Sequence, residues 1–258
     1  MIIQLRQICL IARELAPAID NLTHVFGIRS CFVDPGVGQW GIENTLMPIG
    51  RNFLEVVAPV EDGTAGGRYL DRRGGDGGYM VITQGAEKAT QLAARQRALD
   101  RGVRIAMESQ RENWNICQLH PRDMIASFLE IDWDRHDDFN GNWMPAGGTG
   151  WEDKVAQDVT VDYLAVELQG PDPIAIAELW GHVTDLPVTR DGAVPSIALN
   201  NVTLRFVEAT DGRGPGLGGI DLAVRDRDRI LAAAKQRNCY VADDRVDVCG
   251  VRWTLVDV

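Results

Sequence analysis

Two glutamates stand in the middle of segments whose other residues are mostly apolar. Glu55 lies in RNFLEVVAP (51–59) and Glu130 lies in ASFLEIDW (126–133), in matching frames. Apolar segments of this length and composition are typical of buried strands. A carboxylate buried there without a partner is costly. We therefore expect Glu55 and Glu130 either to pair with an arginine or to act on a ligand, as metal ligands or as a general base.

The strands that position these glutamates belong to a unit that occurs four times. Each copy contains an apolar strand, an amphipathic helix and two or three further strands. In the first copy we predict a strand over 5–12, a helix over 17–26 and strands around 31–33, 43–48 and 52–57. The later copies begin at GGYMVITQ (77–84), VTVDYLAVEL (159–168) and GLGGIDLAV (216–224). The pattern predicts an α+β fold of four βαβββ units.

The chain composition places one boundary between these copies. Residues 134–158 are rich in glycine, asparagine and aspartate and contain few aliphatic residues, which is typical of a linker. We predict an N-terminal pair of units over 1–133, a linker over 134–157 and a C-terminal pair over 158–258. A glycine-rich bridge, EDGTAGGRYLDRRGGDGG (61–78), joins the first two copies.

The net charge and the cysteine content indicate which partners and which cellular compartment to expect. The net charge is −11 and the pI is about 4.8, so nucleic acid and anionic membrane are poor partners. The five cysteines are odd in number and form no CxxC motif, which favours a reducing cytoplasm. The first residues, MIIQLRQICLIARELAP, read as a strand and not as a signal peptide, and no segment has the roughly 20 apolar residues of a membrane helix. We expect a small-molecule substrate and a monomer or homodimer.

Three segments resemble one protein family. ENTLMPIGRNFLEVVAPVEDG, YLDRRGGDGGYMVITQ and CQLHPRDMIASFLEID, together with the four βαβββ units, resemble the vicinal oxygen chelate superfamily, and locally its glyoxalase- and epimerase-like members. The resemblance implies two domains, each with a curved mixed sheet around a cleft. In this superfamily a divalent metal is held by the first and last strands of two paired units, and it stabilises an enolate or a similar oxyanion.

The resemblance assigns the metal positions to four residues. Gln7 and Glu55 take the two positions of the first unit, and Tyr79 and Glu130 take those of the second. Tyr79 departs from the usual histidine, and a neutral phenol is a poor ligand for a divalent ion. The candidate metal ligands are therefore Gln7, Glu55 and Glu130, and a metal-free site stays an alternative. No such set occurs in the C-terminal pair, so we do not expect a dioxygenase.

Other residues of the N-terminal units complete the expected site. Tyr79 either lines the site or donates a hydrogen bond or proton to a substrate oxygen. Gln7 is also a candidate to orient the substrate. Substrate-binding candidates on strands and turns near the same cleft are Trp40, Trp114, Gln118 and His120.

These residues lead to two functional hypotheses. The first is a glyoxalase-like lyase or isomerase that acts on a small oxygenated metabolite, a carbonyl or carboxylate compound. Its catalytic residues would be Glu130, Glu55 and Tyr79, with or without one divalent metal. The second is a metal-free protein that binds a small molecule without catalysis, as the resistance proteins of the superfamily do.

Overall fold

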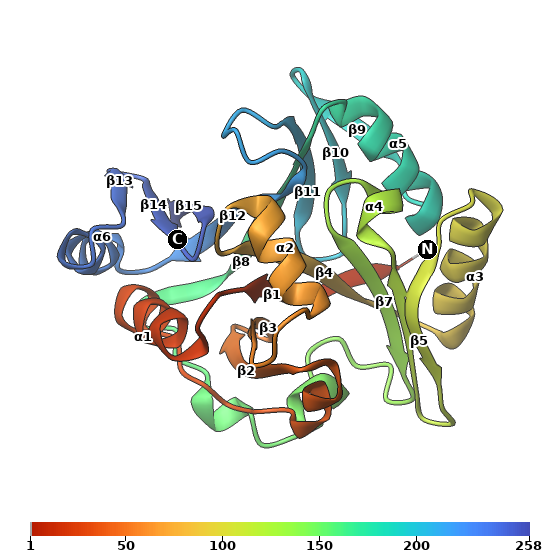
Figure 1. The fold of residues 1–258 in the computed structure, drawn as a ribbon, viewed down its shortest axis with the longest axis horizontal. Coiled ribbons are helices and arrows are strands. Elements are labelled where there is room, and N and C mark those ends of the chain that lie inside the picture. The colour runs from red at the N-terminus through yellow and green to blue at the C-terminus, as the bar shows by residue number, and fades with distance from the viewer. Residues whose placement is uncertain (1) are drawn as a thin grey trace. The chain divides into compact units, whose positions relative to one another are not determined.

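A computed structural model describes residues 2–258 of the chain. The four repeats are present in chain order and in mixed α/β form (Figure 1). The first repeat consists of β1 (Ile3–Ile11), α1 (Leu15–Phe26), β2 (Ile42–Ile49) and β3 (Asn52–Pro59). The second consists of β4 (Gly77–Gly85), α3 (Lys88–Asp100), β5 (Ile105–Gln110), β6 (Trp114–Leu119) and β7 (Phe128–Asp134).

The third repeat consists of β8 (Thr160–Gly170), α5 (Pro173–Thr184), β9 (Val188–Asp191), β10 (Val194–Ala198) and β11 (Thr203–Glu208). The fourth consists of β12 (Gly216–Val224), α6 (Arg227–Gln236), β13 (Tyr240–Ala242), β14 (Arg245–Val248) and β15 (Val251–Asp257).

The first repeat lacks one expected strand. The strand predicted around 31–33 is wrong, because only an isolated bridge between Phe32 and Leu46 forms there. The chain then turns at once into the short 3-10 helix η1 (Pro35–Trp40). The Asp34 side chain accepts a hydrogen bond from the Gly36 N–H, which fixes this turn and prevents the strand from continuing.

The glycine-rich bridge contains a helix that the composition did not suggest. Helix α2 (Ala65–Arg73) begins where the Thr64 side chain accepts a hydrogen bond from the Gly67 N–H. It ends at Gly74, whose left-handed φ of 71° is favourable for glycine. Tyr69 and Leu70 are buried along it, so the cap residues and two apolar side chains offset the low helix propensity of Gly66 and Gly67.

The contacts divide the chain into two compact units, and each unit contains parts of two repeats. Unit 1 contains residues 2–8, Tyr79–Met144 and Ala165–Leu217, and unit 2 contains Cys9–Gly78, Pro145–Leu164 and Gly218–Val258. This grouping by contacts is not contiguous along the chain. The division into 1–133, 134–157 and 158–258 stays a prediction.

Unit 1 contains two mixed sets of strands. In the first, β4 pairs with β7 in parallel, and β7, β6 and β5 pair in antiparallel order. In the second, β8 pairs with β11 in parallel, and β11, β10 and β9 follow in antiparallel order. Helix α3 packs against β6 and β7, and α5 packs against β10 and β11 (Figure 1). The apolar helix faces cover one side of these strands.

Unit 2 is built in a similar way. Strands β2 and β3 form an antiparallel hairpin, and β12 pairs in parallel with β15, which continues antiparallel to β14 and β13. Helices α1 and α6 contact each other, and the Phe26 ring lies 4.8 Å from the Trp253 ring. Each of the five cysteines of the protein is a free thiol.

The predicted linker is anchored by two tryptophans. It contains the short 3-10 helices η2 (Met144–Ala146) and η3 (Glu152–Lys154). Trp143 in unit 1 and Trp151 in unit 2 are almost wholly buried, and Trp151 contacts Phe53 edge to face at 5.0 Å. Burial of two large aromatic side chains favours a fixed path for this segment. Across residues 2–258, no helix combines the length and the apolar character required to span a membrane.

Candidate functional site

Strand β7 of unit 1 carries three carboxylates on one face. Glu130, Asp132 and Asp134 alternate with Leu129, Ile131 and Trp133, and alternate residues of a strand point to the same side. Glu130 is 4% exposed, and Asp132 and Asp134 are fully buried. A row of buried acids on a single strand requires a specific environment or a specific purpose.

This face is the one that helix α3 does not cover. On the side of α3, Asn115 donates to Gln91 Oε1 at 3.4 Å, and the Lys88 ammonium lies 5.2 Å from the Trp133 ring. Asn115 and Trp133 are register partners between β6 and β7. The three carboxylates have the opposite strand parity, so they point away from α3.

Neighbouring strands add polar and aromatic side chains to this face. In the register of β4 with β7, Ile82 pairs with Glu130 and Gln84 pairs with Asp132. In the register of β6 with β7, Gln118 pairs with Glu130 and Trp114 pairs with Asp134. Gln118 and Trp114 are only half-buried, whereas Gln84 is fully buried. The face therefore extends from partly exposed side chains on β6 to fully buried ones on β4 and β7.

Burial changes the protonation of these acids. The pKa of Asp132 is raised well above its usual range, first by complete burial and then by the adjacent negative charge of Glu130. The pKa of Asp134 is also raised by burial, although the His136 N–H, which donates to its Oδ1 at 2.9 Å, and the charge of Arg6 oppose this shift. The protonated form of Asp132 is thus favoured beside Glu130.

A buried arginine lies at the deep end of the face. Arg6 on β1 is fully buried, and its Nη1 donates to Gln84 Oε1 at 3.1 Å and to the Asp138 carbonyl at 3.0 Å. Its Nη2 donates to the Gly141 carbonyl at 3.2 Å, and its guanidinium lies 4.8 Å from the Trp143 ring. Arg6 therefore fixes the loop after β7 and also the orientation of the Gln84 amide.

Gln7, a predicted ligand and orienting residue, is engaged by the same loop. It is 2% exposed, and its Oε1 accepts a hydrogen bond from Trp143 Nε1 at 2.9 Å. Its amide oxygen, the atom that would bind a metal, thus has a protein donor.

Tyr79 and His120 lie around the first residue of β7. The Tyr79 ring contacts Phe128 edge to face at 5.0 Å, and the His120 ring lies 6.5 Å from the same residue. The register pairs Met80 with Phe128, so Met80 has the parity of Glu130 and Tyr79 has the other. His120 begins the short helix α4 (Pro121–Met124), where its Nδ1 accepts from the Arg122 N–H at 3.2 Å. Burial, followed by the charge of Arg104, lowers the pKa of His120.

Glu55 lies in unit 2 and has a partner of its own. It is 8% exposed, and its Oε1 accepts from Asn44 Nδ2 at 2.6 Å. The Asn44 Oδ1 accepts in turn from the Asp34 N–H at 2.9 Å. Trp40, in η1 of the same unit, is 48% exposed. A shared role of Glu55 with Glu130 stays a prediction.

A metal centre built from Gln7, Glu55 and Glu130 stays a prediction, because Glu55 lies in unit 2 and the other two residues lie in unit 1. Among residues 2–258, no group of three or more histidine, cysteine, aspartate or glutamate side chains has a suitable arrangement. The Gln7 oxygen accepts from an indole, and the β4 residue in register with Glu130 is the apolar Ile82. A hard divalent cation prefers several converging oxygen ligands.

Four residues of this face, Asp132, Asp134, Gln84 and Arg6, were not among the predicted site residues. The spacing of the two aspartates, two and four residues after Glu130, was a visible signal, because it places all three acids on one face of a strand. Gln84 and Arg6 had no such signal, since their role depends on the register of β4 with β7 and on the loop after β7.

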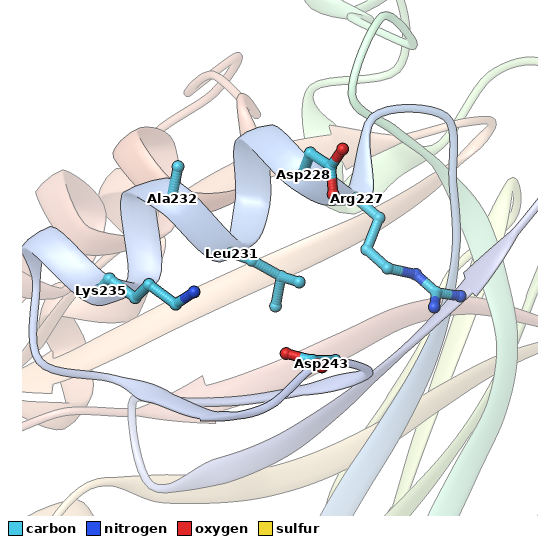
Figure 2. A pocket seen from close by; sticks show the side chains of 6 residues that line it. All are labelled: Arg227, Asp228, Leu231, Ala232, Lys235 and Asp243. Atoms are coloured by element: carbon cyan, nitrogen blue, oxygen red, sulfur yellow. The ribbon is translucent and has the colours of Figure 1, made fainter.

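Unit 2 also contains a surface depression of about 510 Å³ between α6 and the β13–β14 turn (Figure 2). Leu231 points from the helix toward Asp243 on the turn. The nearby cations are already engaged: Lys235 lies 4.6 Å from the Tyr240 ring, and Arg227 pairs with Asp257 at 2.9 Å. None of the predicted site residues line this depression, which is bounded by Arg227, Asp228, Leu231, Ala232, Lys235 and Asp243.

Comparison with known proteins supports the fold. A family model described as a glyoxalase-like domain matches residues 8–184. No curated protein matches the sequence. Among solved structures, a hypothetical protein from Staphylococcus aureus matches at 12% identity with a TM-score of 0.64, and all of each chain is covered.

Two further structures are enzymes. A mutant of 4-hydroxymandelate synthase from Streptomyces coelicolor matches at 14% identity with a TM-score of 0.64, over 92% of this chain and 75% of that one. A methylmalonyl-CoA epimerase in complex with methylmalonyl-CoA and NH4+ matches at 18% identity with a TM-score of 0.46, over 54% of this chain and 99% of that one. The first of these similarities supports the fold alone, and the second is too weak to support a conclusion.

Proposed function

Because this chain belongs to the glyoxalase-like domain family of the vicinal oxygen chelate superfamily, we propose that it is a lyase or isomerase that uses Glu130 as a general base. The substrate would be a small oxygenated metabolite with an acidic C–H bond next to a carbonyl group. The observation that supports this proposal is the position of Glu130 on the face of β7 that α3 does not cover, beside the half-buried Gln118 and the buried Asp132.

Asp132 gives Glu130 a suitable environment for this reaction. Two adjacent buried acids do not readily ionise together, and the raised pKa of Asp132 favours the state in which Asp132 keeps its proton. Glu130 is then the member of the pair that is available as a carboxylate. A base held in a poorly hydrated site is also more reactive toward a weakly acidic C–H bond.

The proposed proton transfer is balanced. Glu130 takes the proton from the carbon next to the carbonyl, the electron pair of the C–H bond forms the C=C bond of an enolate, and the negative charge moves to the carbonyl oxygen. Return of a proton to the same carbon from the opposite side gives an isomerase. Loss of a leaving group from the next carbon gives a lyase. The step requires hydrogen-bond donors near the developing oxyanion.

Metal assistance is not part of this proposal. The Gln7 oxygen already accepts a hydrogen bond from Trp143, and the proposed proton transfer needs only the residues around Glu130. We expect the partners to be a small substrate and, at most, a second copy of the chain, and we expect a cytoplasmic location. Both expectations derive from the acidic charge and the free cysteines.

Hydrogen–deuterium exchange tests the proposal directly. The purified protein is incubated in D2O with a panel of small hydroxycarbonyl and dicarbonyl compounds, and loss of the C–H signal next to the carbonyl is followed by proton NMR. At least one compound is expected to exchange faster with protein than without it. Glu130→Gln, which keeps the shape of the side chain, is expected to lower this rate by at least 100-fold, as removal of a general base does (about 10²–10⁴).

A matched control separates chemistry from general damage. Glu178→Gln changes an exposed glutamate on α5 of the same unit and is expected to leave the exchange rate unchanged. Exchange that is as fast in Glu130→Gln as in the native protein would refute the role of Glu130. Tight binding of a compound with no exchange would favour the alternative, a binding protein without catalysis.

A further inference from the structure

The face around Glu130 contains a second feature that the proposed proton transfer does not use. Several buried polar atoms of unit 1 lack a well-formed hydrogen bond among the described residues, and four side chains on this face contribute such atoms. They are Gln84 Nε2, Trp114 Nε1, Asp134 Oδ2 and the carboxyl oxygens of Asp132, which interact with Glu130 and the Cys117 backbone. We call Gln84, Trp114, Asp132 and Asp134 the polar face.

The strand registers place these four side chains next to one another. Gln84 pairs with Asp132 between β4 and β7, and Trp114 pairs with Asp134 between β6 and β7. Asp132 and Asp134 are two residues apart on one strand, so they share a side. Strands lie about 4.8 Å apart, so the backbone positions of Gln84 and Trp114 are separated by about 10 Å across the sheet.

An unsatisfied buried polar group costs about 1–3 kcal/mol, and such groups in native proteins usually have a functional or solvent partner. The polar face gathers these groups from three adjacent strands. It also borders Glu130 and the half-buried Gln118, where the same face reaches solvent. The cost of leaving these groups without protein partners is thus concentrated beside the proposed base.

The donors and acceptors of the polar face are fixed in identity. Gln84 Oε1 accepts from Arg6, so the Gln84 amide presents its N–H donors through Nε2. The Trp114 indole is a donor only, ionised Asp134 is an acceptor only, and protonated Asp132 can donate one hydrogen bond and also accept. A ligand that satisfies the whole set must accept hydrogen bonds at some positions and donate them at others.

Hydroxyl groups meet this requirement, since each can donate one hydrogen bond and accept two. A carboxylate or phosphate accepts only, and it would leave the acceptor oxygens of Asp132 and Asp134 without a donor. An ammonium group donates only, and it would leave Gln84 Nε2 and Trp114 Nε1 unsatisfied. Arg6 does not reverse this preference, because its two terminal nitrogens donate to Gln84 and to the carbonyls of Asp138 and Gly141. The half-buried Trp114 ring also offers an apolar surface to C–H groups.

We infer that the polar face binds the hydroxyl groups of a neutral polyhydroxylated carbonyl compound, such as a sugar, while Glu130 faces its carbonyl end. This inference rests on the proposed function, and it narrows the substrate class from oxygenated metabolites in general to neutral compounds with more than one hydroxyl group. Gln84 Nε2 and Trp114 Nε1 act as hydroxyl donors, and Arg6 is a positioning residue that orients Gln84.

Equilibrium binding tests the inference without requiring turnover. Ligand-observed NMR titrations compare three neutral probes, D-fructose, D-xylose and myo-inositol, with two anionic ones, D-gluconate and fructose 6-phosphate. At least one neutral probe is expected to bind saturably and at least tenfold more tightly than both anions. Trp114→Phe, which removes only the indole N–H and a small part of the ring, and Gln84→Leu are each expected to weaken that binding at least fivefold.

Matched controls make the outcome decisive. Gln110→Leu, at an exposed position of β5, is expected to bind as the native protein does. Circular dichroism checks that each variant is folded. If Gln84→Leu does not fold, the binding affinity of Trp114→Phe alone tests the inference. The inference is overturned if no neutral probe saturates, if an anionic probe binds as tightly as the best neutral one, or if Trp114→Phe binds as the native protein does.

Failure of this inference can be distinguished from failure of the proposed function. Neutral probes that bind normally to Glu130→Gln but never exchange hydrogen would support the polar face and contradict the role of Glu130 as a base. Catalysed exchange that depends on Glu130 but occurs only with compounds lacking hydroxyl groups would support the base and overturn the polar face.

Discussion

Replacing Asp132 with asparagine is expected to change how the stability of the protein depends on pH. The carboxyl group is fully buried, and its pKa is raised well above the usual range by burial and by the charge of Glu130. In the unfolded chain the same group titrates near its unperturbed value of about 3.9. The folded state therefore retains a proton that the unfolded state releases as the pH rises above that value.

The sign of the effect follows from this difference. The unfolded state binds fewer protons than the folded state between the two pKa values, so the Asp132 contribution to stability decreases as pH rises. The slope is at most about 1.4 kcal/mol per pH unit, and it ends once the pH passes the folded pKa. Because the group is fully buried, solvent screening does not reduce this slope. Asparagine cannot titrate, so the variant lacks the Asp132 contribution at every pH.

The measurement is urea unfolding followed by circular dichroism at half-unit steps between pH 4.5 and 7.5. The free energy of unfolding of Asp132→Asn, relative to the native protein, is expected to rise with pH until the pH passes the folded pKa of Asp132, with a slope of at most about 1.4 kcal/mol per pH unit. Any cost of burying the new amide adds a constant offset and does not alter the slope. Asp62→Asn, at an exposed position, is expected to give no slope of this size.

The coupling to Glu130 gives an internal check. In a Glu130→Gln background the second cause of the raised Asp132 pKa is absent, so the slope is expected to end at a lower pH. A difference between native protein and Asp132→Asn that stays constant from pH 4.5 to 7.5 would refute the conclusion that Asp132 is protonated in the folded state.

Three further variants test the buried polar contacts by urea unfolding at neutral pH. Arg6→Met is expected to lower the free energy of unfolding by about 3–5 kcal/mol, because the Gln84 amide oxygen and the Asp138 carbonyl would lose the buried guanidinium that donates to them. Trp143→Phe is expected to cost about 1 kcal/mol through loss of the hydrogen bond to Gln7, together with some loss of packing. Asn44→Ala is expected to cost about 1.5–3 kcal/mol, because the Glu55 carboxylate loses a short hydrogen bond. A change below about 0.5 kcal/mol in any of these variants, which is typical of surface positions, would contradict the corresponding contact.

The repeat pattern and the fold class were predictable from the sequence. The first strand of each repeat is a mainly apolar segment followed by a segment that favours a helix, and both signals are local. The strand around Phe32 was predicted wrongly because the competing Asp34 turn depends on one side-chain hydrogen bond. Helix α2 was missed because its caps, Thr64 and Gly74, stabilise a segment of poor intrinsic propensity.

The candidate site was predictable only in part. Glu130, Gln118 and Trp114 do lie on one face, which follows from strand parity once β6 and β7 pair in this register. Tyr79 has the opposite strand parity from Glu130, but its ring contacts Phe128, which shares the parity of Glu130, so its role stays a prediction. The register of β4 against β7 depends on pairing between segments far apart in the sequence, so the sequence alone does not fix which β4 side chains lie beside Glu130.

The composition of unit 2 has a consequence for biosynthesis. This unit joins residues 9–78 with 218–258, and helix α1, near the N-terminus, packs against α6, close to the C-terminus. On the ribosome, the apolar side of α1 emerges long before Trp253, the ring that Phe26 contacts. The contacts of α1 with β2 and β3 can form early, whereas the contact of Phe26 with Trp253 must wait until β15 has been synthesised, so a chain that stops before β15 would lack part of the cover of this helix.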